Sequence, residues 1–449
     1  MAASQAVPSG PAERPGLLLI AREWGRIGIT GFGGPPAHIA LLRRLCVDRT
    51  AWLSAAEFED GIAATSLLPG PASTQLAIFC AWRLGGPLGA LIGGVCFIVP
   101  GLIIILALSV LFLAHSPPAW VTGAAAGAGA AVPAVAVTAA IGLAPASWRR
   151  ARSARPPAAG SAAPGPAAAK PAAAGPAVTG PAAAATAAAG PDQAQPESAG
   201  ASRAGIRIPP VRAATARWLA YLVAGGVAAN LAGQYLVAVL LGCGLAEWLA
   251  SRPASPGQRS ALLAPLAAKA ITAGVLGSLA WEALKVGALS FGGGFVIIPL
   301  MQHDAVHTYH WMTSAQFLSA VALGQVTPGP VVQTVAVVGY AAAGIPGGLL
   351  AAVIAFAPSF AFVLAGGRHF DRFRRSATAQ AFLSGSGPAA IGAIAGAAVT
   401  LGFGLTQLWQ VAVLAAAAVW LVAFRRGVVS AILAAAAVGI IVTLAGAAP

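Results

Sequence analysis

Two polar stretches interrupt long apolar sequence, and each follows a Pro-Gly-Pro tripeptide. The first reads LLPGPASTQ at residues 67 to 75, and the second reads VTPGPVVQT at residues 326 to 334. Proline interrupts a helix because it has no N–H to donate and its ring collides with the preceding turn. A helix that starts just after such a break presents unpaired N–H groups and the positive end of its dipole to an anion. The two stretches therefore predict a pair of anion-binding helix starts.

Hydroxyl and amide side chains cluster at these breaks, and an FGG motif upstream of each adds glycines that let the backbone approach a ligand closely. In the first half, the candidates for binding the anion are Thr30, Gly33, Gly34, His38, Gly70, Ser73, Thr74, Gln75 and Arg83. In the second half, they are Ser290, Gly292, Gly293, Thr327, Gly329, Gln333 and Thr334. A basic side chain at a membrane edge also serves to set topology, so both roles stay open for Arg83.

Several titratable residues near the breaks are candidates for coupling a proton to the anion. They are Glu23, His38, Glu57, Asp60 and Glu282. A carboxylate inside a membrane is costly and is therefore usually functional. A position in the headgroup zone is the alternative for the carboxylates, and a structural hydrogen bond between helices is the alternative for His38.

Three histidines of the second half have spacings of four and three residues, which would place them on one helical face. His303, His307 and His310, with Asp304 beside them, are compatible with a metal site. They occupy a loop that has no matching histidines in the first half, so we expect no metal and no cofactor. The cysteines show no paired spacing, which predicts neither a disulfide framework nor a metal site. With no convergent nucleophile and base, we expect that the chain is not an enzyme.

The composition is that of a membrane protein. Of the 449 residues, 58% are hydrophobic and only 8% are charged. A transmembrane helix needs ~20 apolar residues, and uncharged stretches of that length occur at 86 to 114, 118 to 147, 343 to 367, 376 to 424 and 427 to 449. No removable signal peptide is expected at the start. The sequence therefore predicts an all-α polytopic protein of the cell membrane, with the lipid bilayer as its partner.

The two halves repeat each other. A shift of 259 residues places the first FGG motif on the second and the first Pro-Gly-Pro on the second, without a gap. At this shift Glu23 matches Glu282, Gly28 matches Gly287, Trp52 matches Trp311, Phe58 matches Phe317, and Gly85 matches Gly344. Rare aromatic residues in register with both breaks indicate an internal duplication.

The basic residues indicate how the two copies are oriented. Arg43, Arg44 and Arg49 follow the first FGG motif, whereas the matching segment 302–308 has no lysine or arginine. Because basic loops stay in the cytoplasm, this bias predicts inverted topology, with the substrate near the membrane midplane. Residues 55–82 should then enter and leave on one side, as a re-entrant hairpin broken at Pro-Gly-Pro.

These patterns divide the chain into four segments. Residues 1–16 are expected to form a flexible N-terminus, 17–148 the first repeat, 149–216 a linker, and 217–449 the second repeat with its preceding spans. The linker is rich in alanine, proline and glycine, and the segment from Arg149 to Arg217 contributes +7 of the net charge of +14. This composition predicts a disordered cytoplasmic linker. Contact with anionic lipid headgroups is the alternative, and no nucleic-acid partner is expected.

The motifs resemble those of the chromate ion transporter family. The stretches that carry the resemblance are GFGGPPAHIALLRR, LLPGPASTQLAIFCAWRLGGPLGA, SFGGGFVIIPLMQ and TPGPVVQTVAVVGY. The long form of that family consists of two fused homologous domains. The resemblance implies a carrier that exports chromate, a dianion similar to sulfate. It also implies that export is driven by the proton motive force, in exchange for protons, and that it confers resistance to chromate. The long linker departs from the family pattern.

Alternatives remain open within this architecture. A carrier for sulfate or another oxyanion would present the same donors, because tetrahedral dianions offer nearly identical hydrogen-bonding surfaces. An anion channel would share the broken helices but show flux that does not respond to a proton gradient. Gly123, Gly127 and Gly129 permit close helix packing within the subunit or in a homodimer.

Overall fold

The computed structural model describes residues 15–66, 68–114, 116–153, 210–231, 235–251, 274–290, 295–366 and 376–446. The N-terminal residues 1–14, most of the predicted linker, and the candidates Gly292 and Gly293 lie outside these ranges. The two ends of the predicted linker are helical, because one helix runs on to Ser153 and the next begins at Pro210. The described residues form helices and connecting turns, with no strand among them. The predicted all-α fold is confirmed for this part of the chain.

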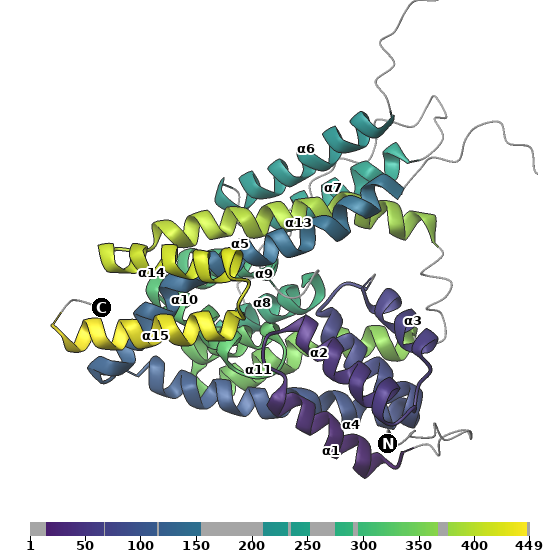
Figure 1. Cartoon of the computed structure of the whole chain (residues 1–449), viewed down its shortest axis with the longest axis horizontal. Coiled ribbons are helices and arrows are strands. Elements are labelled where there is room, and N and C mark those ends of the chain that lie inside the picture. Colours follow the sequence, from purple (N-terminus) through teal and green to yellow (C-terminus); the bar gives the residue numbers. More distant parts are fainter. Residues whose placement is uncertain are drawn as a thin grey trace, which may run out of the picture.

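The helices occur in two series (Figure 1). The first series is α1 (Leu17–Thr30), α2 (Pro35–Arg43), η1 (Arg44–Arg49), α3 (Ala55–Thr65), α4 (Ala72–Phe112), α5 (Ala119–Ser153), α6 (Pro210–Leu231) and α7 (Leu236–Ala250). The second series is α8 (Val275–Leu289), α9 (Ile297–Gln302), η4 (His303–Thr308), α10 (Ser314–Val326), η5 (Val331–Gln333), α11 (Thr334–Gly366), α13 (Ala377–Phe403), α14 (Leu408–Ala418), η6 (Val419–Ala423) and α15 (Val428–Leu444).

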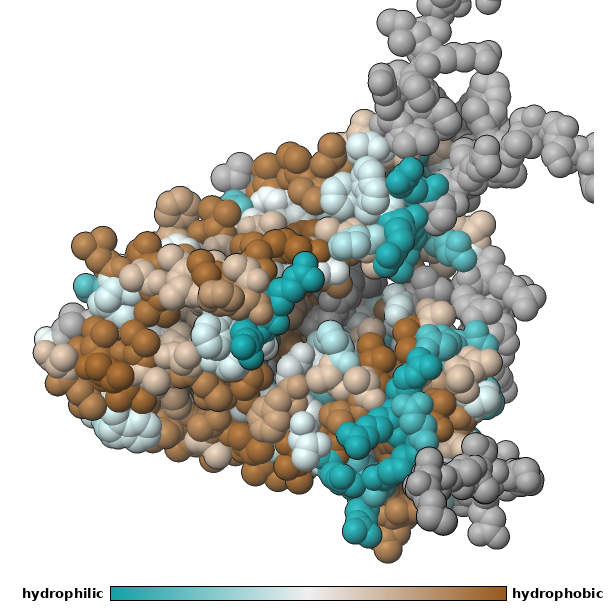
Figure 2. All heavy atoms as spheres, viewed as in Figure 1, coloured by the Kyte–Doolittle hydropathy of each residue, from teal (hydrophilic) through white to brown (hydrophobic). Residues whose placement is uncertain are grey.

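Long apolar helices confirm the membrane character of the fold. In the described part of the chain, four helical segments are long and apolar enough to cross a bilayer: Ala72–Phe112, Ala119–Arg152, Val331–Gly366 and Ala377–Phe403. Large apolar side chains such as Leu88, Ile103 and Val353 are more than 60% exposed, which suits a surface facing lipid. Figure 2 shows this apolar surface, with hydrophilic residues gathered mainly at one end of the molecule.

The duplication extends to fine details of the backbone. Ser54 and Glu57 form a capping box at the start of α3, and Thr313 and Gln316 form one at the start of α10. A π-helical turn precedes each of these helices, at η1 and η4. The single left-handed residues Ala51 and His310 also lie 259 positions apart. The chain therefore consists of two copies of one structural unit.

One predicted pair is displaced by a residue. In each copy the helix after Pro-Gly-Pro changes direction at a glycine with positive φ, which is +63° at Gly86 and +65° at Gly344. Gly344 thus corresponds to Gly86 and not to Gly85, so the ungapped alignment is wrong at this point. The second copy starts with the 3-10 turn η5, whose three residues rise about as far as four α-helical residues do. The second copy therefore needs one residue fewer than the first between its Pro-Gly-Pro and the bend.

The end of each half packs on the other half. Helices α14 and α15 pack against α5, and α6 and α7 pack against α13. A Cβ on Gly127 of α5 would lie 2.1 Å from the carbonyl oxygen of Ala435 in α15, so these backbones nearly touch. Gly123 packs against Gly439 of the same helix α15, and Gly129 packs against Leu318. The predicted close packing at these glycines therefore occurs inside the subunit.

Equivalent elements lie toward opposite ends of the molecule. In Figure 1, α3 lies near the right-hand end, whereas its counterpart α10 lies toward the left. The pair α6 and α7 lies toward the right, whereas α14 and α15 lie at the left. This arrangement favours the inverted orientation that the basic residues predict.

Candidate functional site

The Pro-Gly-Pro break of each half contacts the opposite half. The backbone N–H of Gly329, in the second Pro-Gly-Pro, donates to the carbonyl oxygen of Gly31 at 3.1 Å. Gly31 ends α1 just before the first FGG motif. A Cβ on Gly34 would lie 3.6 Å from Val331. The FGG motif of the first half therefore lies against the Pro-Gly-Pro break of the second.

The first Pro-Gly-Pro break lies against the second half in turn. Gly70 has a φ of +122°, which disfavours any side chain. A Cβ there would lie 2.5 Å from Nε2 of Gln75, and 3.4 Å from both the carbonyl oxygen of Gly287 and the hydroxyl of Ser359. Both breaks are thus enclosed by the opposite half, as a midplane site between repeats requires.

Each half forms the predicted antiparallel pair of helices around its break. In the first half, Gly61 of α3 lies against Phe79 of α4, and Glu57 pairs with Arg83 at the open end of the pair. In the second half, Gly324 of α10 lies against Thr334 of α11. The chain therefore turns back at each Pro-Gly-Pro, as a re-entrant hairpin would.

Neither helix start at the breaks is capped by a side chain. The N-cap residues are Pro71 for α4 and Pro330 for η5, and neither makes a side-chain cap hydrogen bond. By contrast, α3 and α10 each begin with a complete capping box at a more exposed position. A buried helix end without a cap leaves N–H donors for a ligand.

Buried polar side chains surround these uncapped ends. Ser73, Thr74, Gln75, Gln333 and Thr334 are each at most 2% exposed. The amide nitrogen of Gln75 donates to the carbonyl oxygen of Pro69 at 2.7 Å. The amide nitrogen of Gln333 donates across the halves to the carbonyl oxygen of Ile98 in α4, also at 2.7 Å. These two bonds fix the shape of the breaks.

Several donors at the centre have no hydrogen-bond partner in the described part of the chain. They are the hydroxyl groups of Thr74, Ser290 and Ser359 and the amide nitrogen of Gln325. An unsatisfied buried group costs about 1–3 kcal/mol. Donors left unpaired beside two uncapped helix starts are well suited to an oxyanion. Thr327, in contrast, bonds back to the carbonyl oxygen of Leu323 at 2.8 Å.

His38 connects the first FGG motif with the first helix start. Its ring is fully buried and lies edge-on to Phe97 of α4. Nε2 lies 2.9 Å from the carbonyl oxygen of Gly31, and Nδ1 lies 3.3 Å from the hydroxyl oxygen of Ser73. A carbonyl only accepts, so Nε2 carries the hydrogen, and neutral Nδ1 accepts from Ser73. His38 therefore orients the Ser73 hydroxyl.

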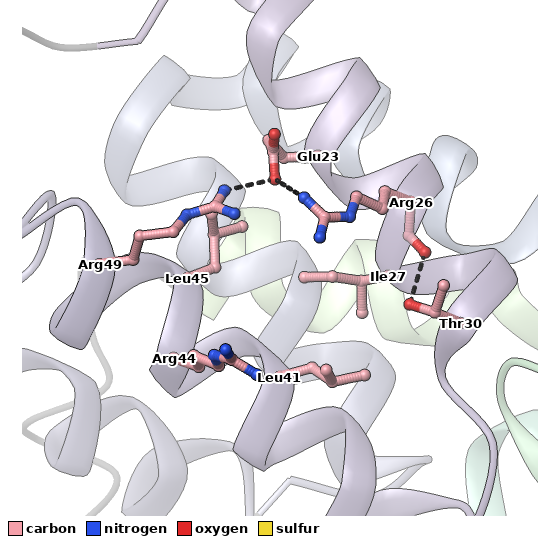
Figure 3. Close-up of a pocket in the computed structure, with 8 residues that line it drawn as sticks. All are labelled: Glu23, Arg26, Ile27, Thr30, Leu41, Arg44, Leu45 and Arg49. Atoms are coloured by element: carbon pink, nitrogen blue, oxygen red, sulfur yellow. Dashed lines mark hydrogen bonds and ion pairs between the residues drawn. The ribbon is translucent and has the colours of Figure 1, made fainter.

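A basic pocket lies beside α1, α2 and η1 (Figure 3). Its volume is about 140 Å³, and its lining includes Arg26, Arg44 and Arg49 around Glu23, with Thr30 at one side. Arg49 donates to Glu23 at 2.7 Å, and Arg26 lies 3.8 Å from the same carboxylate. With three guanidinium groups and one carboxylate, the lining of the pocket carries a net positive charge. Thr30 is exposed and lines this pocket, and its hydroxyl donates to the backbone carbonyl oxygen of Arg26.

Other predicted residues are partly or fully exposed. Glu57 and Arg83 are about 40% exposed and pair with each other. Asp60 and Gly33 are exposed. Of the proton-coupling candidates, only His38 and Glu282 are fully buried. Glu282 lies on α8 beside Lys285, which also pairs with Asp304.

The three histidines of the second half do not share one α-helical face. His303 and His307 belong to the π-helical turn η4, and their ring centroids are 6.0 Å apart. His310 follows this turn with a left-handed φ of +53° and bonds to the carbonyl oxygen of Val306. The α-helical spacing that the sequence suggested does not apply to this segment, because η4 is wound more loosely.

Comparison with known proteins agrees with this geometry. The profile of the family described as "Chromate transporter" matches residues 18–248 and 277–440. The chain belongs to the chromate transporter family. Both family matches contain an FGG motif and a Pro-Gly-Pro break, so each copy found in the structure is a family unit.

Relatives in the chromate transporter family span most of the chain. A chromate transport protein of Cupriavidus metallidurans is 29% identical over 84% of this chain and 80% of its own length. A chromate transport protein of Pseudomonas aeruginosa is 28% identical over 89% of this chain and 83% of its own length. A probable chromate transport protein of Synechococcus elongatus is 26% identical over 86% of this chain and 84% of its own length. No solved structure matches the chain.

Sequence reasoning missed some residues at the centre. Ser359 is fully buried on α11 and lies near Gly70, almost 290 positions earlier in the chain. Asp304 was considered only as a neighbour of the histidines, yet it pairs with Lys285. No local pattern marks Ser359, because its contact with Gly70 depends on packing between the two halves. No local pattern marks the Asp304 pair.

Proposed function

We propose that this protein exports chromate, or a closely similar tetrahedral dianion, from the cytoplasm in exchange for protons. The observation that carries the proposal is the pair of uncapped, buried helix starts at α4 and η5, where the two halves meet. The uncapped N–H groups and the unpaired hydroxyl groups of Thr74, Ser290 and Ser359 form the anion site. The chromate transport proteins among the relatives support chromate as the substrate.

The site binds the dianion through neutral donors. None of the residues from Pro69 to Gln75 or from Thr327 to Thr334 carries a positive charge. Helix dipoles and hydroxyl groups stabilise the anion without a buried guanidinium group. A buried guanidinium would be left as an unpaired positive charge after the anion is released. Such a site suits a carrier, which must bind the ion and then let it go.

The basic pocket serves as the entrance on the cytoplasmic side. Arg26, Arg44 and Arg49 raise the local concentration of anions at the end of α1. Gly31, the residue that ends α1, contacts both His38 and Gly329. The pocket is therefore only a few residues away from the central site along the chain.

The proposed orientation in the membrane follows from the two helix pairs at the breaks. Each hairpin enters and leaves on one face of the plasma membrane, with its Pro-Gly-Pro turn near the midplane. Non-helical backbone at that depth is permitted because protein surrounds it. The predicted linker and the basic pocket then lie on the cytoplasmic side.

Purified protein in liposomes tests this proposal. The expected result is saturable exchange of external for internal chromate. When a pH gradient is imposed, chromate should accumulate in the more acidic compartment, because protons leave that compartment in exchange. Sulfate in parallel assays establishes which dianion is preferred. Flux that neither saturates nor responds to the pH gradient would identify a channel instead. Absence of any chromate flux in protein that is folded would overturn the proposal.

A further inference from the structure

The position equivalent to the basic pocket is acidic in the second half. Glu23 and Arg26 correspond to Glu282 and Lys285, while Leu45 corresponds to Asp304. The Nζ of Lys285 lies 2.6 Å from Oε2 of Glu282, and it also donates to Asp304. The same site of the repeat thus holds a surplus of cations in one copy and of carboxylates in the other.

This acidic cluster is buried, unlike its counterpart. The side chains of Glu282, Asp304 and Lys285 are 0%, 6% and 14% exposed. The hydroxyl of Thr308 lies 3.4 Å from Oδ1 of Asp304, and Oε1 of Glu282 has no hydrogen-bond partner among the described residues. Arg26, in contrast, is 61% exposed. The cluster is therefore shielded from water on most sides.

The charges within the cluster do not balance. Two carboxylates share a single ammonium group, so full ionisation would leave one net negative charge buried. An uncompensated buried charge is strongly destabilising, whereas one proton shared between the carboxylates removes it. His303 and His307 lie on η4 beside the cluster. The helices α9, α10 and α11, which pack on η4 or α8, contain no Asp, Glu, Lys or Arg.

Helix α8 connects this cluster with the anion site. Glu282 and Lys285 lie on α8, and five residues after Glu282 the carbonyl oxygen of Gly287 faces Gly70 of the first break. Ser290, whose buried hydroxyl has no partner in the part of the chain that the structure describes, ends the same helix. A change in the pairing of Lys285 therefore acts on a helix that forms part of the wall of the site.

We propose that Glu282, Asp304 and Lys285 form the proton-binding site of the carrier, in which the two carboxylates share one exchangeable proton. The proposal rests on the proposed function, because it names the group that carries the proton in exchange for the dianion. Binding of the proton makes one O–H bond on a carboxylate and leaves Lys285 paired with the other. Release of the proton restores the second carboxylate–ammonium contact. No other group changes its charge in this step.

Glu282→Gln and Asp304→Asn test the assignment in liposomes. Each variant is measured for chromate exchange at equal pH on both sides and for accumulation driven by a pH gradient. We expect both variants to retain exchange and to lose gradient-driven accumulation. Glu59→Gln is the matched control, since it removes an exposed carboxylate that pairs with Arg43, and it should retain both activities.

The outcomes separate this inference from the proposed function. No chromate exchange by the wild-type protein would refute the proposed function, whatever the variants do. Normal exchange with normal gradient-driven accumulation in both variants would refute the proton site. Loss of both activities in variants that insert and unfold like the wild type would show a structural role and would also refute it. If neither variant inserts, infrared spectroscopy of the wild-type protein decides, because a protonated carboxyl band that changes on addition of chromate is required.

Discussion

Gly329 donates its backbone N–H to the carbonyl oxygen of Gly31 at 3.1 Å, although the two glycines belong to different copies of the repeat. His38 donates to the same carbonyl oxygen. One carbonyl group therefore joins the end of α1, the second break and the buried histidine. This junction lies beside the proposed anion site, so both halves contribute to the position of the groups around it.

Substitution of the glycines in the breaks should abolish transport without preventing insertion. Gly70→Leu and Gly329→Leu place side chains at φ values of +122° and +103°, which costs about 1–3 kcal/mol, and they fill space beside Gln75 and Gln333. Chromate exchange in liposomes measures the effect. Gly446→Ala is the control, because its φ is +94° but its surroundings are open. Unaltered exchange in both Leu variants would exclude the breaks as the site.

His38→Ile replaces the histidine with the residue found at the matching position, Ile297. The carbonyl of Gly31 would lose one donor and the Ser73 hydroxyl would lose its partner. We expect chromate exchange to fall at least about fivefold, since an unmade buried hydrogen bond costs about 1–3 kcal/mol. His310→Asn, on an exposed left-handed residue, should have no effect. Wild-type exchange by the His38 variant would show that this histidine is dispensable.

The basic pocket should control the KM for chromate. Arg44→Gln removes a positive charge from the pocket and should raise KM with little change in kcat, whereas Glu23→Gln should lower KM. Both effects should shrink as ionic strength rises, because salt screens exposed charges. Arg426→Gln, an exposed arginine between η6 and α15, serves as the control. Equal KM values in all three variants would exclude an electrostatic role for the pocket.

Arg83 should not contact the substrate. It pairs with Glu57 at the open end of the first hairpin, where both side chains are about 40% exposed. An exposed pair contributes about 0–1 kcal/mol, so Arg83→Gln should reduce thermal stability slightly and leave KM for chromate unchanged. A clear rise in KM would instead support the direct anion contact considered from the sequence.

The contact between α5 and α15 should be intolerant of added volume. Gly127→Leu would drive a side chain into the backbone of Ala435, and overpacking of this kind costs about 1–3 kcal/mol or more. We expect a lower unfolding temperature and poor recovery from membranes. Gly142→Leu on the same helix, where a Cβ meets nothing within 4 Å, should behave like the wild type.

The sequence predicted those features that depend on local chemistry. Pro-Gly-Pro specifies a break wherever it occurs, and the matching of Trp52 with Trp311 and of Phe58 with Phe317 reveals the duplication without any coordinates. The contact between Gly70 and Ser359 was not predicted, because it depends on how α11 folds back across the other half. The displacement at Gly86 was missed since a 3-10 turn leaves no clear mark on the sequence.

The grouping of buried charges was also only partly predictable from the sequence. Glu282 was a candidate because it recurs at the position of Glu23, yet the sequence did not show that Asp304 would join it. Leu45 holds the equivalent place in the first half, so the repeat itself gave no indication. Burial distinguishes the two acidic groups, and burial follows from packing between segments distant in sequence.

Because α14 and α15 pack on α5, the packing around α5 is completed only late in synthesis. Helix α5 ends at Ser153, but the hairpin that covers it begins only at Leu408, so it leaves the ribosome much later than α5 does. Until then, the small-residue face of α5 has only lipid or the insertion machinery as a neighbour. We therefore expect that a protein truncated before Val428 is recognised by membrane quality control and degraded, even though every residue of the proposed anion site is present.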